Sequence, residues 1–94
     1  MKNMAKNRRE IDLLSMLGLH ILELRQDRKM SQIVLAARAK LSKTYLSDLE
    51  NGRRNPSAVI LLRIADALQI TVDELFEGCT PEKREPRREE GFYR

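Results

Sequence analysis

The chain is poor in the residues that supply disulfides, metal sites and aromatic packing. Among its 94 residues there is one cysteine, Cys79, one histidine, His20, and no tryptophan. A single cysteine cannot close an internal disulfide, which is typical of a reducing cytoplasm, and it excludes the usual cysteine-rich zinc sites. A single histidine likewise excludes a histidine cluster. We therefore expect a cytoplasmic protein that holds no metal and no other cofactor.

Long apolar runs and catalytic patterns are absent as well. No stretch approaches the ~20 apolar residues of a membrane span. The basic start, MKNMAKNRREIDLL, lacks the apolar segment of a signal peptide. The sequence shows no nucleophile paired with a base and no glycine-rich phosphate loop. These absences argue against a membrane protein and against an enzyme.

The abundant residues are aliphatic and charged. Hydrophobic residues make up 41% of the chain and aromatic residues only 4%, so the core must be built from Leu, Ile, Val and Ala. A composition that is also rich in Lys, Arg, Glu and Asp favours helices over strands. A length of 94 residues suffices for one small domain and not for two. The sequence therefore predicts a single all-α domain.

The net charge of +4 is concentrated in one segment. Residues 28–54 carry seven basic and two acidic side chains, which leaves +5 on this segment and −1 on the rest of the chain. A local basic patch on a small helical domain indicates a polyanionic partner. A solvated surface without any partner explains the same charges equally well.

Apolar side chains at helical spacing predict five helices. The expected helices span about residues 13–28, 32–39, 42–51, 58–68 and 72–76. The last four have capping residues at their starts, which are Ser31, Ser42, Ser57 and Thr71. Lys40 and Leu41 form the expected turn between the second and third helices. Gly52 is expected to end the third helix in a left-handed conformation.

Both ends of the chain differ in composition from this middle part. Residues 1–12 are polar and basic, and they predict a flexible N-terminal arm or the frayed start of a helix. Residues 78–94 contain two prolines and alternating charges, and they predict a disordered C-terminal tail. The folded domain is therefore expected to cover residues 13–77.

The helix expected at 42–51 presents a polar outer face. Leu46 and Leu49 point inward at helical spacing, so the early outward side chains are Lys43, Thr44, Ser47 and Asp48. These side chains both donate and accept hydrogen bonds, and such groups can read base edges in the major groove of DNA. The basic loop RRN follows the helix.

The segment from Leu17 to Phe76 resembles the lambda-repressor-like, Cro/C1-type (XRE family) helix-turn-helix domains. The motifs that carry the resemblance appear in the family's order: Ser-Gln, Leu-Ala, Tyr-Leu-Ser, Leu-Glu-Asn-Gly, Asn-Pro-Ser and Val-Asp-Glu-Leu-Phe. The resemblance implies a compact five-helix DNA-binding domain and a sequence-specific transcriptional regulator. Such a regulator would bind double-stranded DNA at a palindromic operator as a homodimer, with the helix at 42–51 in the major groove.

The resemblance also implies roles for single residues. The family's base-contacting positions match Lys43, Thr44 and Asp48, with Ser47 beside them. Its backbone-contacting positions match Gln32, Tyr45, Asn51, Arg53 and Asn55. A structural ion pair is implied between Arg25 and Glu50. Because a carboxylate is unfavourable near phosphates, we expect Asp48 to face a cytosine amino group or to lie away from the backbone.

The chain departs from the family pattern at two places. Lys40 stands where glycine is usual, and a left-handed lysine costs roughly 1 kcal/mol relative to glycine. Ile33 and Val34 occupy positions that are commonly polar, and they suggest a contact with the N-terminal arm or a second subunit, although isolated exposed apolar residues need no explanation.

A second class of function uses the same fold. Antitoxins and subunits of larger complexes resemble these domains too, and a fold alone does not fix a function. In that case the charged C-terminal tail would bind a protein partner. This alternative does not exclude DNA binding.

Overall fold

The computed structural model describes the backbone of residues 4–79 and the side chains of residues 13–79. It contains five helices: α1 (Met4–Asp27), α2 (Gln32–Ala39), α3 (Lys43–Glu50), α4 (Ala58–Leu68) and α5 (Val72–Leu75). No β-strand occurs among residues 4–79. The predicted all-α class and the predicted order of five helices are therefore confirmed.

The first helix begins earlier than the sequence predicts. Helix α1 starts at Met4 rather than at Leu13, so the predicted boundary is wrong. The early segment, MAKNRREID, consists mainly of good helix formers, and extending an existing helix is much easier than nucleating one. The predicted flexibility of residues 1–12 stays a prediction. Most of the predicted tail, residues 80–94, lies outside the described residues.

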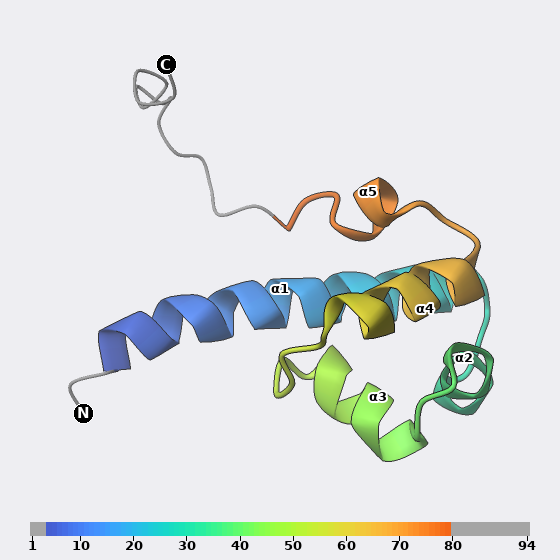
Figure 1. The fold of residues 1–94 in the computed structure, drawn as a ribbon, viewed down its shortest axis with the longest axis horizontal. Helices are drawn as coiled ribbons and strands as arrows, with labels where there is room; N and C mark the ends of the chain where they lie inside the picture. Colours follow the sequence, from blue (N-terminus) through green and yellow to red (C-terminus); the bar gives the residue numbers. More distant parts are fainter. Residues whose placement is uncertain (1–3, 80–94) are drawn as a thin grey trace.

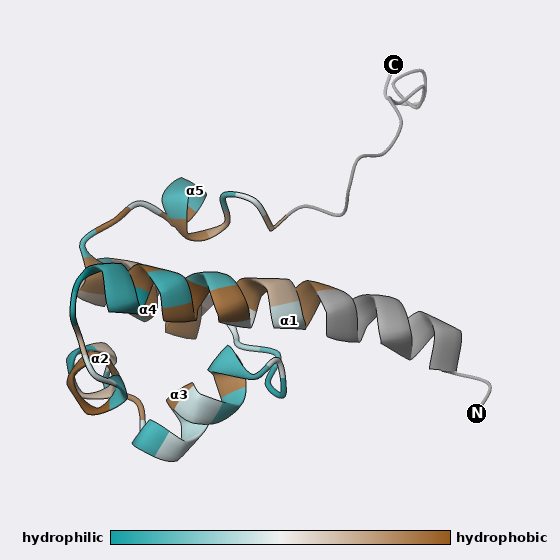
Figure 2. Cartoon of the chain, turned by 180° about the vertical axis from the view of Figure 1, so that it is seen from behind, coloured by the Kyte–Doolittle hydropathy of each residue, from teal (hydrophilic) through white to brown (hydrophobic). Residues whose placement is uncertain are grey.

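The helices are arranged on two sides of α1 and α4. Helices α2 and α3 lie on one side, and the short α5 lies on the other (Figure 1). The view from behind shows the same separation, and its colours mark apolar residues in both α1 and α4 (Figure 2). Close contacts join α1 to α3, α2 to α3 and α4 to both α2 and α5. The two-helix unit α2–α3 is therefore held from one side by α1 and α4.

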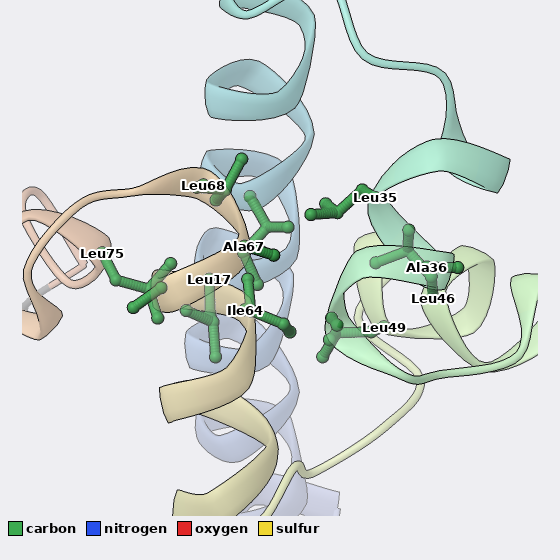
Figure 3. Close-up of a cluster of buried hydrophobic side chains, with 12 residues drawn as sticks. Leu17, Leu35, Ala36, Leu46, Leu49, Ile64, Ala67, Leu68 and Leu75 are labelled. Atoms are coloured by element: carbon green, nitrogen blue, oxygen red, sulfur yellow. The ribbon is translucent and has the colours of Figure 1, made fainter.

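The core is aliphatic, as the composition predicts. All five helices contribute to a cluster of leucine, isoleucine and alanine side chains that meet between α1, α4 and the α2–α3 unit (Figure 3). The largest fully buried side chains are Ile21, Leu35, Leu46, Leu49, Ile64, Leu68 and Leu75. Burying each of these contributes about 1.5–3 kcal/mol relative to exposure, so this cluster holds the two-helix unit in place.

The predicted caps are present at the start of four helices. The side chains of Ser31, Ser42, Ser57 and Thr71 each accept a hydrogen bond from the backbone N–H three residues later. Each such cap is worth about 1 kcal/mol. Lys40 ends α2 in the left-handed region, with φ of 60°, as predicted for this turn.

Helices α1 and α3 approach each other closely at a glycine. A Cβ atom added to Gly18 would lie 2.3 Å from the backbone oxygen of Leu49. Gly52, after α3, has a φ of +77°, and an added Cβ would lie 2.6 Å from Oγ of Ser15. The middle of α1 and the C-terminal end of α3 thus approach each other closely. The sequence reading predicted the conformation of Gly52 but not the contact at Gly18.

Candidate nucleic-acid interface

Helix α3 is fixed so that one polar face looks outward. Leu46 and Leu49 are fully buried, and they set the rotation of the helix about its own axis. Lys43 and Thr44 are consequently exposed, while Ser47 and Asp48 are half-buried on the same outer side. The four residues predicted to contact bases are therefore brought together on one face of α3.

Asp48 is engaged by the loop that follows the helix. Its carboxylate oxygens lie 3.5 Å from Nη2 of Arg54 and 3.9 Å from Nη1 of Arg53. The guanidinium of Arg54 also lies over the ring of Tyr45, at 4.9 Å from its centroid. Two residues predicted to touch DNA, Asp48 and Arg53, thus contact each other. No role was predicted for Arg54 from the sequence. Its position next to Arg53 and the nearby acid, Asp48, are the sequence features that could have indicated one.

Arg25 and Glu50 form a buried ion pair between α1 and α3. Nε of Arg25 donates to Oε2 of Glu50 at 2.7 Å, and Nη2 donates to Oε1 at 3.0 Å, so the pair is bidentate. Nη1 of Arg25 donates to the backbone oxygen of Met30 at 2.9 Å. The side chain of Glu50 is only 3% exposed. These hydrogen bonds satisfy both charged groups, as burial requires.

Gln32 joins this buried pair to the first turn of α2. Its Nε2 donates to Oε1 of Glu50 at 2.8 Å. A carboxylate only accepts hydrogen bonds, so the amide nitrogen of Gln32 must face Glu50. That nitrogen carries a second hydrogen, which the bond to Glu50 leaves for another acceptor. Gln32 is half-buried, and its orientation is therefore set from inside the protein.

The remaining predicted backbone contacts lie at the end of α3 and in the loop after it. Asn51 is exposed, and its Nδ2 donates to the backbone oxygen of Ser47 at 2.9 Å. Asn55 is exposed and Tyr45 is half-buried. The backbone N–H of Arg53 donates to the carbonyl oxygen of Asp48 at 2.8 Å, which ties the start of the loop to the helix.

The solvent-facing charge of residues 28–54 is more positive than the sequence suggests. All seven basic residues between positions 28 and 54 are exposed. Of the two acidic residues, Glu50 is buried and paired with Arg25, which leaves Asp48 as the only acid near the surface of this segment. A surface of this kind attracts a polyanion over a Debye length.

The other side of the molecule carries a different set of groups. Nε2 of His20 donates to the backbone oxygen of Glu74 at 3.0 Å and so connects α1 to α5. Burial raises the pKa of the Cys79 thiol, which therefore stays protonated at neutral pH. Among the described residues, no three or more acidic, histidine or cysteine side chains gather as a metal site would require. None of the described helices is both long and apolar enough to cross a bilayer.

Comparison with known proteins identifies the architecture. The family model described as helix-turn-helix matches residues 21–75 of the chain. The chain is 48% identical over 56 residues to the HTH-type transcriptional regulator DdrOP3 of Deinococcus deserti, covering 60% of this chain and 43% of that protein. It is 43% identical over 58 residues to the immunity repressor protein of Bacillus phage phi105, covering 62% and 40% of the two chains. It thus spans less than half the length of these two relatives.

A solved structure extends the likeness to the fold. The restriction-modification controller protein C.AhdI from Aeromonas hydrophila superimposes with a TM-score of 0.66 at 40% sequence identity. The superposition covers 67% of this chain and 96% of the controller protein. Nearly the whole of the controller protein therefore has a structural counterpart in this chain.

Proposed function

The chain belongs to the helix-turn-helix family whose model covers residues 21–75, and from this we propose that it is a sequence-specific DNA-binding regulator of transcription. The observation that carries the proposal is the outer face of α3, where Lys43 and Thr44 are exposed beside a basic loop. The names of the relatives, transcriptional regulator and repressor, support the same function. We infer that it acts in the cytoplasm and that its chemistry is binding, not catalysis.

The proposed mechanism divides the contacts between bases and backbone. Lys43, Thr44 and Ser47 would contact base edges with α3 in the major groove, and Asp48 would accept from a cytosine amino group. Contacts to phosphates would set the position and orientation of the domain on the duplex. The residues proposed for these contacts are Gln32, Tyr45, Asn51, Arg53 and Asn55.

The hydrogen bonds around Glu50 support this separation of base contacts from backbone contacts. The base-reading face belongs to α3, and the first proposed phosphate contact, Gln32, belongs to α2. The bond from Gln32 to Glu50, at 2.8 Å, joins the two helices through a side chain that Arg25 holds rigidly. A phosphate contact at Gln32 would therefore set the depth and angle of α3 in the groove.

We propose that a homodimer reads a palindromic operator. A single domain of this size offers only a handful of base contacts, and a two-fold dimer doubles them on half-sites one helical turn apart. The α4 surface supports this proposal because Val59 and Leu62, one turn apart, are 57% and 55% exposed. Ile33, which is 63% exposed, offers a second candidate surface for the contact between copies. Sedimentation of Leu62→Glu and of Ile33→Glu distinguishes the two surfaces, because only the variant at the contact between copies should report monomers.

Selection of bound duplexes from a random pool tests the function directly. We expect a palindromic winner that is preferred over scrambled DNA by ~10³-fold or more at physiological salt. Lys43→Ala and Thr44→Ala should change the selected sequence while leaving the helical content unaltered. Arg53→Ala should weaken binding to every sequence and reduce the salt slope by about 1. Binding that is equal on all sequences and disappears with salt would contradict the proposal.

That contradictory result would favour the second function, an antitoxin or an interaction subunit. Its predicted binding element, the tail at 78–94, lies outside the described residues from position 80 onward, so this alternative stays a prediction. Co-purification of a protein partner that is lost when residues 80–94 are removed would support it.

A further inference from the structure

Asp48 occupies an unusual position on the candidate interface. It is the only acidic side chain near the surface between positions 28 and 57, and it lies on the face proposed to meet DNA. Its two carboxylate oxygens contact two different arginines, Arg53 at 3.9 Å and Arg54 at 3.5 Å. Both arginines come from the basic loop, whose proposed role is to contact phosphates.

Arg54 is held from two sides by α3. Asp48 contacts its guanidinium at 3.5 Å, and the ring of Tyr45 lies beneath the same group at 4.9 Å. Tyr45 and Asp48 are three residues apart, so both project from the same side of the helix. The backbone bond from Arg53 to the carbonyl of Asp48 brings the loop against this surface. In the free protein, the loop arginines are thus folded onto the reading helix.

The contacts between Asp48 and the two arginines can compete with phosphate contacts, yet they are weak enough to be exchanged for them. Breaking an exposed ion pair changes the equilibrium constant of the process that breaks it by only about 1.4- to 5-fold. Any phosphate that takes Arg53 or Arg54 from Asp48 removes one of the two partners of this carboxylate. The carboxylate is then left close to the DNA backbone, where like charges repel. Binding to arbitrary DNA therefore gains less from the two arginines than their charge suggests.

We propose that Asp48 determines specificity by competing with DNA phosphates for Arg53 and Arg54. At a matching site, a cytosine amino group replaces the arginines as the partner of Asp48, and both arginines become available for phosphates. At other sites no amino group replaces the arginines, which stay shared between Asp48 and the DNA phosphates. This inference rests on the proposed DNA-binding function and names the group that suppresses binding to the wrong sequences.

The test is the affinity of Asp48→Asn for scrambled duplex DNA, measured by fluorescence anisotropy at several salt concentrations. The matched control is Asp73→Asn, because Asp73 is an exposed acid on α5, away from α2 and α3, and its replacement removes the same charge. We expect Asp48→Asn to bind scrambled DNA ~2- to 5-fold more tightly than Asp73→Asn, with a salt slope steeper by about 1. Equal affinities and slopes for the two variants would overturn the proposal.

A second comparison separates competition for the arginines from general repulsion. In a background that carries Arg53→Ala and Arg54→Ala, Asp48→Asn should lose most of its gain on scrambled DNA. A gain that persists undiminished would show that the carboxylate acts on the DNA directly, and it would overturn the proposed competition. Neither measurement needs an operator. A failure to find any preferred sequence would therefore overturn the proposed function separately from this inference.

Discussion

Helix α3 carries two carboxylates, Asp48 and Glu50, in opposite environments. Glu50 is 3% exposed and accepts three hydrogen bonds, all at 3.0 Å or less, from Arg25 and Gln32. Asp48 is 27% exposed, and its nearest arginine nitrogen is 3.5 Å away. The two residues are two positions apart, so they project from different sides of the helix. One faces α1 and the core, and the other faces solvent.

The difference shows how burial decides what an ion pair does. A buried charge that loses its partner stays in a medium of low dielectric, so the cost of breaking the pair is large. An exposed charge that loses its partner is hydrated at once, and the pair contributes little to stability. The pair at Glu50 is consequently structural, whereas the contacts at Asp48 can be exchanged for contacts with DNA.

The largest expected effect is the loss of the buried carboxylate. Glu50→Ala should lower the free energy of unfolding by about 3–5 kcal/mol, because it leaves Arg25 buried without a partner. Urea denaturation followed by circular dichroism measures this change. The control is the double variant Arg25→Met/Glu50→Leu, which removes both charges and should recover most of the loss. A double variant that is as unstable as Glu50→Ala would show that packing, not the stranded charge, carries the cost.

The next effect tests the contact that brings the two helices close enough for the buried pair. Gly18→Ala should destabilise the fold by roughly 1–3 kcal/mol, because the added methyl would lie 2.3 Å from the backbone oxygen of Leu49. Thermal unfolding provides the measurement. Gly78→Ala is a comparison without a clash, since it adds a methyl with no atom within 4 Å and reports only the roughly 1 kcal/mol cost of a left-handed alanine at φ of +81°. If Gly18→Ala unfolded at the temperature of the unchanged protein, the close approach of α1 and α3 would be wrong.

Gln32 connects the buried pair to the interface, and its replacement should affect both. Gln32→Ala should cost about 1 kcal/mol of stability through one lost hydrogen bond. It should also weaken binding to the selected operator and to scrambled DNA by the same factor, because a phosphate contact carries no sequence information. Denaturation and anisotropy on the two duplexes report these effects separately. A loss confined to the operator would assign Gln32 to base readout instead.

The smallest expected effect is on the exposed side. Asp48→Asn should change the free energy of unfolding by no more than about 0.5 kcal/mol, since it removes only exposed ion pairs. Glu50→Gln makes the same isosteric change in the buried pair and should cost several times more. Urea denaturation of the two variants measures this difference in the free energy of unfolding. Equal losses would mean that Asp48 is a structural residue and could not release its arginines to DNA.

Local patterns were sufficient for much of the helical framework. The four caps, the left-handed Lys40 and the inward leucines of α3 depend on neighbours within one or two turns, and they follow the predicted pattern. The start of α1 was predicted wrongly because helix propagation depends on an existing helix rather than on an apolar stripe. The roles in DNA contact assigned to single residues stay predictions.

The sequence by itself determined the fold class, the order of the helices and the polar face of α3, because periodicity and capping are properties of short segments. The family resemblance also implied the pairing of Arg25 with Glu50, but only the tertiary structure showed that Glu50 holds Gln32 as well and that the contacts of Asp48 are exposed. Gln32 lies 18 positions from Glu50 in sequence, and Arg25 lies 25 positions from it. No local pattern encodes these contacts, or the close approach at Gly18, because they arise only when α1, α2 and α3 pack around a common core.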